Sequence, residues 1–219
     1  MRFQNSWLCL AAALVITGSA GCQISASTPE ERTGAGIQNP KAEPGKPAPE
    51  FTLPDTKGQS RSLSAFKGKF VVLEWVNYDC PFVRKHYDSG NMQRLQKDSK
   101  QKGVVWLSIN SSAPGKQGNF PAEEVNRLIK EKGAEPTAYL IDTDGRVGQT
   151  YGAKATPTMI LIDPKGVLVY AGAIDDKPTT DKQDIAGAKN YVRLALDEAM
   201  GSKPVSISST KAYGCSVKY

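Results

Sequence analysis

The chain has 219 residues, with 28 Lys and Arg against 22 Asp and Glu, which gives a formal net charge of +6. This length is sufficient for one domain of about 150 residues with appendages at its ends. The basic residues are spread along the chain without an aromatic-interleaved block, so we expect no nucleic-acid partner.

Residues 1–22 predict an export signal. Arg2 precedes an apolar stretch from Leu8 to Ile16 that is too short to span a bilayer, and small residues follow it. Ser19-Ala20-Gly21-Cys22 resembles the lipobox of bacterial lipoproteins, although Ser19 replaces the usual Leu. We therefore expect a protein of the bacterial periplasm or cell envelope, attached to the membrane through lipidated Cys22. Ordinary signal-peptidase cleavage nearby is the alternative.

Residues 23–46 are rich in Ser, Pro, Gly, Ala and Glu, and their large apolar side chains are Ile24 and Ile37. A segment of this composition cannot bury enough apolar surface to fold, so it predicts a flexible tether. Residues 47–200 are then the folded domain, and 201–219 are a C-terminal tail that carries Cys215.

The first half of the domain alternates between predicted strands and helices. An extended segment at 50–53 precedes a buried strand at about 70–77, and a helix begins near Pro81 and continues past Gly90 to about Lys100. A second strand follows at 104–109. After a loop at 111–120, Pro121 opens a helix that continues to about residue 132.

The second half predicts a strand at 138–142 and a hairpin formed by 158–163 and 167–171. Apolar residues with helical spacing from Ile185 to Met200 predict a final amphipathic helix. Strands that alternate with helices and end in a hairpin predict an α/β domain, with a central mixed sheet and helices on both faces.

Cys80 lies where the strand at 70–77 gives way to a helix. The N–H groups of the first turn and the helix dipole favour a thiolate there, so we predict a partly exposed, nucleophilic cysteine with a low pKa. An inert core cysteine is the alternative, because free cysteine is among the most buried residue types. Pro157 follows Thr156 just before a strand, which suits a cis bond that presents backbone to whatever approaches the sulfur.

These residues resemble a known family. Residues 74–85 (EWVNYDCPFVRK) resemble the active-site segment of the thioredoxin superfamily, with Cys80 as the first cysteine of its Cys-x-x-Cys, and Thr156-Pro157 resembles its cis-proline loop. The approach APEFTLPD at 48–55 and LIDTDG at 140–145 resemble the alkyl hydroperoxide reductase and thiol-specific antioxidant (redoxin) branch. The resemblance covers about residues 46–200. It implies a thioredoxin-like fold and cysteine redox chemistry that needs no cofactor or metal.

Two departures from the family keep the reaction open. Val83 stands at the second cysteine of Cys-x-x-Cys, and Leu73 and Asn77 replace the Pro and Thr/Ser of the peroxiredoxin motif. We expect a thiol–disulfide oxidoreductase that acts on protein thiols or disulfides and depends on an external thiol reductant. A peroxiredoxin-like thiol peroxidase is the alternative. A third possibility is a copper-delivery module. Copper-delivery proteins of the same fold use Cys-x-x-x-Cys-Pro, and Cys80-Pro81 would supply its second half, but Val76 occupies the first cysteine position here.

Cys215 is the expected partner of Cys80, because Cys9 would leave with the signal and Cys22 would carry lipid. We predict that Cys80 and Cys215 form a reversible disulfide during turnover. A static bridge, or a cysteine that never meets Cys80, is the alternative.

Three other polar residues are candidates. Glu74 lies where thioredoxins carry a buried carboxylate that relays protons, although a Glu paired with Lys at a sheet edge is equally expected. Asn77 is predicted to donate a hydrogen bond to a sulfur or a peroxide oxygen. His86 is predicted to be a solvated helix residue, with proton transfer or metal ligation as alternatives.

Overall fold

The structure is a computed structural model that describes residues 41–219. The predicted export signal, Cys22 and most of the predicted tether lie outside these residues. Gly45 donates its N–H to the carbonyl of Leu168 at 2.8 Å, and Ala48 donates to Gly166 at 2.9 Å. The folded domain therefore begins before the predicted boundary at residue 47.

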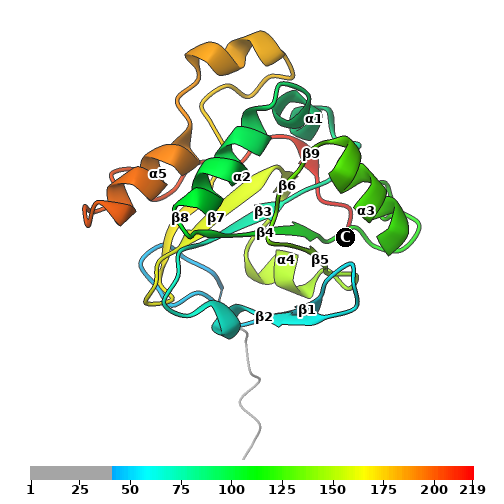
Figure 1. Cartoon of the computed structure of the whole chain (residues 1–219), viewed down its shortest axis with the longest axis horizontal. Coiled ribbons are helices and arrows are strands. Elements are labelled where there is room, and N and C mark those ends of the chain that lie inside the picture. Colours follow the sequence, from blue (N-terminus) through cyan, green and yellow to red (C-terminus); the bar gives the residue numbers. More distant parts are fainter. Residues whose placement is uncertain (1–40) are drawn as a thin grey trace, which may run out of the picture. The chain divides into compact units, whose positions relative to one another are not determined.

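A five-stranded sheet in the order β5-β4-β3-β7-β8 forms the centre of the domain (Figure 1). Strands β3, β4 and β5 are parallel, and the hairpin of β7 and β8 runs antiparallel to β3. The predicted mixed sheet is thus confirmed, because each long apolar run of the sequence became one of its strands. Their bounds are β3 (Val71–Trp75), β4 (Val105–Asn110), β5 (Ala138–Ile141), β7 (Thr158–Ile162) and β8 (Leu168–Gly172).

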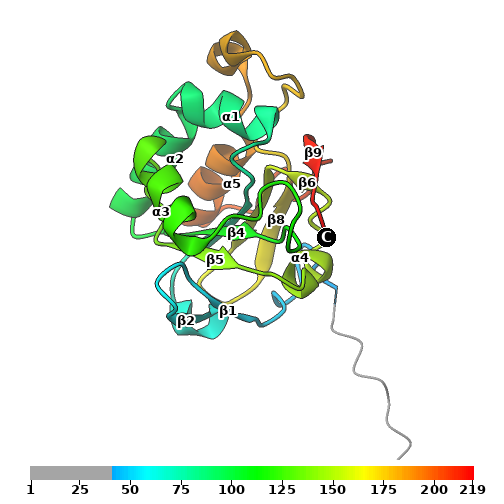
Figure 2. The same ribbon diagram turned by 90° about the vertical axis from the view of Figure 1, so that its right-hand side faces the viewer.

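Four helices cover one face of this sheet (Figure 2). Strand β3 alternates its side chains between the two faces, and Val72 lies in the core on this side with Trp106 of β4. Among residues 41–219, no helix combines the length and the apolar character needed to cross a bilayer. The four helices are α1 (Pro81–Asp88), α2 (Asn91–Gln101), α3 (Ala122–Glu131) and α5 (Tyr191–Met200).

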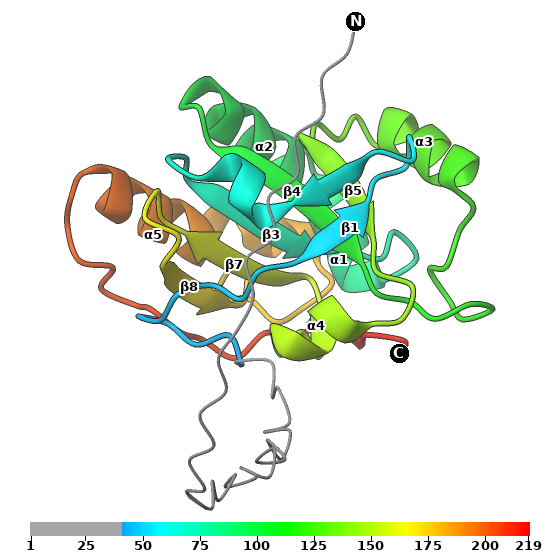
Figure 3. The same cartoon turned by 90° about the horizontal axis from the view of Figure 1, so that it is seen from below.

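The opposite face is covered by smaller elements (Figure 3). Leu73 and Trp75 of β3 point to this side and pack with Tyr151, which follows α4. The expected two-sided covering is therefore present, although the sequence predicted only the first of these elements. They are β1 (Thr52–Pro54), β2 (Ser60–Ser62), the 3-10 helix η1 (Leu63–Phe66) and α4 (Arg146–Thr150).

The last helix begins later than predicted. Residues 182–187 form a separate 3-10 helix, η2 (Lys182–Gly187), and α5 starts only after Asn190, whose side chain accepts the N–H of Arg193 at 2.9 Å. Asparagine is a favoured N-cap, so the helix begins where this cap is available. Residues 173–190, here called the crossover segment, lead from β8 to α5, and their η2 turn packs against α1 (Figure 1).

The tail, residues 201–219, returns along the edge of the sheet. Thr210 donates its N–H to Ala171 of β8 at 3.0 Å, and further on β9 (Cys215–Ser216) pairs antiparallel with β6 (Ala155–Thr156) (Figure 2). The Tyr219 hydroxyl then donates to the carbonyl of Ala153 at 2.6 Å. The tail is thus an ordered part of the domain, and it ends beside the cis-proline loop.

Candidate active site

Cys80 is the N-cap of helix α1. Its backbone is extended, with φ −72° and ψ 123°, and Pro81 occupies the first helical position. The Cys80 N–H donates to the carbonyl of Asn77 at 3.0 Å, while the Cys80 carbonyl accepts the N–H of Arg84 at 2.9 Å. The sulfur therefore lies at a helix N-terminus directly after the central strand, as the sequence predicted.

The predicted partial exposure of Cys80 is wrong, because the side chain is fully buried. The tail covers it. Gly214 approaches the cis-proline loop so closely that a Cβ on it would lie 2.0 Å from the Thr156 carbonyl oxygen and 3.5 Å from Phe82. Since Gly214 also has φ +129°, a residue with a side chain would fit neither the space nor the backbone there.

The loop before β7 faces the Cys80 sulfur. The Thr156–Pro157 bond is cis, as predicted. The Cys80 thiol donates to the Thr156 carbonyl at 3.2 Å, and the Thr156 Oγ1 is buried without a hydrogen-bond partner among the atoms described.

Cys215 lies against Cys80. In the β6–β9 pair Thr156 is opposite Cys215, and the Cys80 sulfur contacts the carbonyl of that same Thr156 at 3.2 Å. The side chain and the backbone N–H of Cys215 are both close enough to lower the Cys80 pKa. Both cysteines are free thiols in this structure. The fold thus brings together the two cysteines that were expected to pair, although 135 positions separate them in the sequence.

The surroundings shift the pKa values of the two thiols in opposite directions. Burial opposes ionisation of Cys80, but the polar groups of Thr156 and Cys215 and the Val83 N–H outweigh it and lower the Cys80 pKa. Burial, followed by the hydrogen bond to Cys80 and its negative charge, raises the pKa of Cys215 to about 11. The pair therefore consists of a thiolate-forming Cys80 and a Cys215 that keeps its proton and donates it in a hydrogen bond.

Glu74 is fully buried in the core beneath α1 and α2. Its carboxylate accepts hydrogen bonds from the Tyr87 hydroxyl at 2.8 Å, the Trp106 indole at 2.8 Å and the Ser108 hydroxyl at 3.0 Å, with the Gln96 amide at 3.3 Å. Burial raises the pKa of Glu74, and these hydrogen bonds counteract the rise. The alternative of a Glu–Lys pair at a sheet edge is wrong, because β3 is a central strand.

The Glu74 network does not extend to the sulfur atoms. Val83, at the position of the missing second cysteine, is fully buried in the same core. Within residues 41–219 no hydrogen bond joins Glu74 to Cys80 or Cys215. The predicted proton relay therefore lacks a direct hydrogen-bonded path in this structure.

Asn77 holds the turn before Cys80. Its Oδ1 accepts the N–H of Asp79 at 3.0 Å, and its Nδ2 donates to the carbonyl of Gln117 at 3.4 Å. The predicted hydrogen bond from Asn77 to the sulfur is wrong, because the side-chain amide packs against Gly118 and stabilises an Asx turn instead.

The prediction of a solvated His86 is also wrong. The side chain is fully buried between α1, the crossover segment and the tail, with Nε2 3.4 Å from the Tyr213 hydroxyl and 3.9 Å from Asp175 Oδ2. Burial, opposed by Asp175 and reinforced by Lys85, lowers the pKa of His86 to about 4. Tyr213 and Asp175 were missed, although Tyr213 lies only two positions before Cys215.

Residues 41–219 contain no group of three or more His, Cys, Asp or Glu side chains that could hold a metal ion. Val76, at the first cysteine position of the copper-delivery pattern, is a buried core residue.

A sulfur nucleophile between a helix start and a cis-proline loop is the arrangement that thioredoxin-like oxidoreductases use, and this domain has that class of fold and site. The Redoxin family profile matches residues 43–190. The chain belongs to the Redoxin family.

Relatives support the same class. The chain is 29% identical to the thiol-disulfide oxidoreductase ResA of Halalkalibacterium halodurans over 138 residues, which cover 62% of this chain and 73% of that protein. It is 26% identical to the thioredoxin-like protein YneN of Bacillus subtilis over 83% of this chain and 98% of the relative. A crystal structure of a hypothetical protein from Sinorhizobium meliloti 1021 matches with a TM-score of 0.68 and 26% identity, over 82% of this chain and 96% of that one.

Proposed function

We propose that this protein is a thiol–disulfide oxidoreductase in which Cys80 is the nucleophile and Cys215 is the resolving thiol. The observation that carries the proposal is the placement of two free thiols at the cis-proline loop: the Cys80 sulfur lies 3.2 Å from the Thr156 carbonyl, and Cys215 is paired with Thr156 in the β6–β9 ladder. The lowered pKa of Cys80 and the pKa of Cys215, raised to about 11, agree with these roles. The names of the relatives, thiol-disulfide oxidoreductase and thioredoxin-like protein, support the reaction class.

In the first step the Cys80 thiolate attacks a disulfide of a partner protein. The partner's S–S bond breaks, a mixed disulfide forms on Cys80, and the partner's leaving sulfur takes up a proton. The α1 N-terminus and the Cys215 N–H stabilise the negative charge on Cys80 until the attack.

In the second step Cys215 gives up its proton, and its thiolate attacks the Cys80 sulfur of the mixed disulfide. The partner leaves as a second thiol, and a Cys80–Cys215 disulfide remains, so two electrons have passed from this protein to its partner. An external thiol reductant restores the two free thiols. Run in reverse, the same steps oxidise a partner dithiol.

The partner docks on the β6 edge, where Pro157 holds the backbone of Ala155 and Thr156 against the sulfur. β9 occupies this edge as an extended strand, which supports its capacity to accept an extended peptide. Since β9 also covers Cys80, a partner must displace part of the tail before it reaches the sulfur.

We extend the proposal to cellular location. Residues 1–22 direct export to the periplasm or cell envelope, Cys22 carries lipid, and the segment that follows tethers the redox domain to a membrane. Metabolic labelling with a radioactive fatty acid, compared between the native chain and Cys22→Ser, tests this directly. Label that remains in the Cys22→Ser chain would contradict it.

Peptide mapping after reaction with a disulfide-bonded peptide tests the mechanism. We expect the native protein to accumulate the Cys80–Cys215 disulfide, Cys215→Ser to stop as a mixed disulfide on Cys80, and Cys80→Ser to remain unreacted. If Cys80→Ser consumes the peptide disulfide as fast as the native protein, the assignment of the nucleophile is wrong. If Cys215→Ser turns over normally, the external thiol alone resolves the mixed disulfide.

A further inference from the structure

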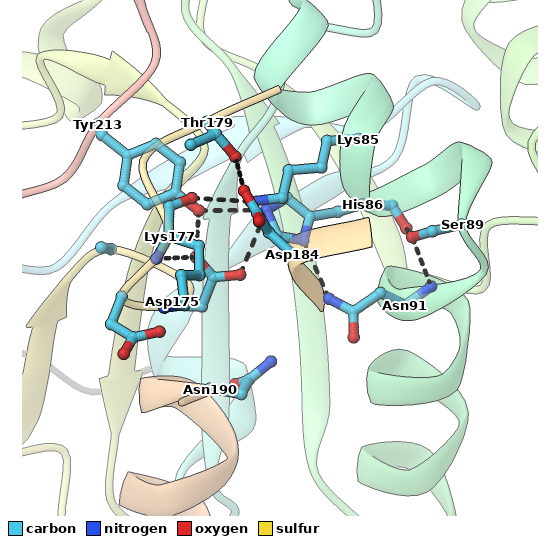
Figure 4. Close-up of polar contacts among 12 residues, drawn as sticks. Lys85, His86, Ser89, Asn91, Asp175, Lys177, Thr179, Asp184, Asn190 and Tyr213 are labelled. Carbon is cyan, nitrogen blue, oxygen red and sulfur yellow. Dashed lines mark hydrogen bonds and ion pairs between the residues drawn. The ribbon is translucent and has the colours of Figure 1, made fainter. Parts of the chain in front are cut away.

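A buried polar cluster lies behind the site and takes no part in the proposed steps. It joins three segments that are far apart in the sequence: α1, the crossover segment and the tail (Figure 4). Its central members are His86 of α1, Asp175 of the crossover segment and Tyr213 of the tail.

Tyr213 is the point at which the tail enters this cluster. Its hydroxyl donates to Asp175 Oδ1, and its ring packs edge-on against Phe82 of α1 at 5.9 Å between centroids. The Lys85 ammonium lies 5.9 Å from the centre of the same ring and donates to the Lys177 carbonyl at 2.7 Å. Tyr213 is therefore held by a carboxylate, an aromatic ring and a cation at once.

The hydrogen bonds of the cluster form a chain in which each group donates to the next, from Asn91 through His86 and Tyr213 to Asp175. The Asn91 amide donates to His86 Nδ1 at 2.9 Å, so the hydrogen of the neutral ring lies on Nε2 and points to the Tyr213 hydroxyl. That hydroxyl donates in turn to Asp175, which also accepts the N–H of Lys177 at 2.9 Å. Asp175 is 2% exposed, so these donors take the place of the water that would otherwise hydrogen-bond its side-chain oxygens.

The link from this cluster to the reacting sulfur is short. One residue, Gly214, separates Tyr213 from Cys215, and it is wedged against the Thr156 carbonyl. Two of the cluster residues, Lys85 and His86, belong to the same short helix that Cys80 caps. A fixed Tyr213 therefore fixes Cys215 relative to the helix that carries Cys80.

We propose that Tyr213, held by Asp175 and His86, is the anchor that positions Cys215 for its attack on the Cys80 sulfur. These three are positioning residues, because none of them touches the reacting atoms. The inference rests on the proposed function, in which Cys215 resolves a mixed disulfide on Cys80. The inference adds that the rate of this second step depends on the buried contact between Tyr213 and Asp175, one residue beyond Gly214 from Cys215.

Rapid-mixing kinetics on the full chain with oxidised glutathione test the anchor. The first step is formation of the glutathione mixed disulfide on Cys80, and the second is release of reduced glutathione as Cys215 attacks. Tyr213→Phe removes one hydrogen bond to a buried charge, so we expect the second step to slow by about tenfold or more. The pH profile gives the fraction of Cys80 that is thiolate, and the rate constant of the first step is divided by that fraction. This corrected rate constant should be no smaller than in the native chain, because a looser tail covers the sulfur less.

Three further variants keep the test independent of folding defects. Asp175→Asn should slow the second step in the same way, and combining it with Tyr213→Phe should add little, since both act on one contact. Tyr191→Phe removes a hydroxyl from nearby α5 and should change neither step. If Tyr213→Phe leaves the second step unchanged, or slows both steps in parallel, the anchor is overturned.

The same experiment separates the anchor from the proposed function. If the native chain forms no Cys80–Cys215 disulfide with oxidised glutathione, the proposed function fails, and the anchor fails with it. If the native chain resolves the mixed disulfide and Tyr213→Phe resolves it equally fast, only the anchor fails.

Discussion

Each of the two cysteines alters the acidity of the other before any bond forms between them. The side chain of Cys215 helps to lower the Cys80 pKa, and burial together with the nearby Cys80 sulfur raises the Cys215 pKa to about 11. In a Cys-x-x-Cys site the second thiol would come from the same helix. Here Val83 fills that place in the core, and the donor arrives on a strand from the tail.

This dependence predicts a difference between two substitutions of Cys215. Cys215→Ala removes the S–H donor and should raise the Cys80 pKa, because a hydrogen bond to a charged group contributes about 1.5–3 kcal/mol. Cys215→Ser supplies a hydroxyl donor and should leave the Cys80 pKa close to its native value. Thiolate ultraviolet absorbance of the reduced proteins against pH measures both. Equal pKa values in the two variants would exclude Cys215 as the donor.

Glu74 predicts a pH-dependent stability. Its folded-state pKa is raised above 4.5, so its contribution to stability is complete below pH 4.5 and is lost as the pH rises through the folded-state value. Glu74→Gln should destabilise by about 1–3 kcal/mol, since an amide N–H₂ would face hydrogen-bond donors, and this cost should be smaller near neutral pH than at pH 4.5. Urea unfolding across this range, with exposed Glu123→Gln as control, measures it. A cost that grows with pH would contradict the raised pKa.

At the scale of elements, local sequence signals were sufficient for the sheet and for the start of α1. Val71–Trp75 is apolar except for Glu74, and Pro81 marks the start of the helix. Strand β3 and the beginning of α1 could therefore be predicted from residues close together in the chain. The burial of Cys80 and His86 could not. Cys80 contacts Thr156, 76 positions away in sequence, and His86 contacts Tyr213, 127 positions away, so neither burial shows in the residues around it.

The β9 strand was missed for a related reason. A two-residue strand has no periodicity, and Cys215–Ser216 is extended only because β6 offers it hydrogen bonds. The one local clue was Gly214, which the sequence showed next to Cys215 and whose close approach to Thr156 the structure explains.

Gly214→Ala should therefore detach β9 without unfolding the domain. The new Cβ would meet the Thr156 carbonyl at 2.0 Å in a backbone conformation that L-residues rarely adopt. We expect the Cys80–Cys215 disulfide to form at least about tenfold more slowly, and iodoacetamide to reach Cys80 more readily, while the far-ultraviolet circular dichroism stays unchanged. Gly187→Ala, where a Cβ meets nothing within 4 Å, is the control. Normal disulfide formation in Gly214→Ala would show that the tail tolerates a shift of this strand.

At the scale of the whole molecule, oxidation joins the start of α1 to the tail and closes a loop that contains most of the domain. In the chain-entropy account a loop of this size stabilises the folded state by about 4–5 kcal/mol, less any strain in the native bond. The oxidised protein should thus unfold at a higher guanidinium concentration than the reduced protein, and Cys215→Ser should show no such difference. Equal midpoints for the oxidised and reduced native protein would mean that the bond strains the fold as much as it constrains the unfolded chain.

The distance between the two cysteines along the chain also has a consequence in time. Cys80 is synthesised 135 positions before Cys215, which at about 5–20 residues per second means that roughly 7–27 s pass before the second cysteine exists. During that interval the nascent polypeptide carries the proposed nucleophile with no internal partner and no tail to cover it. The thiol is then open to mispairing with other chains, so successful biogenesis depends on keeping Cys80 reduced or shielded until β9 can join β6.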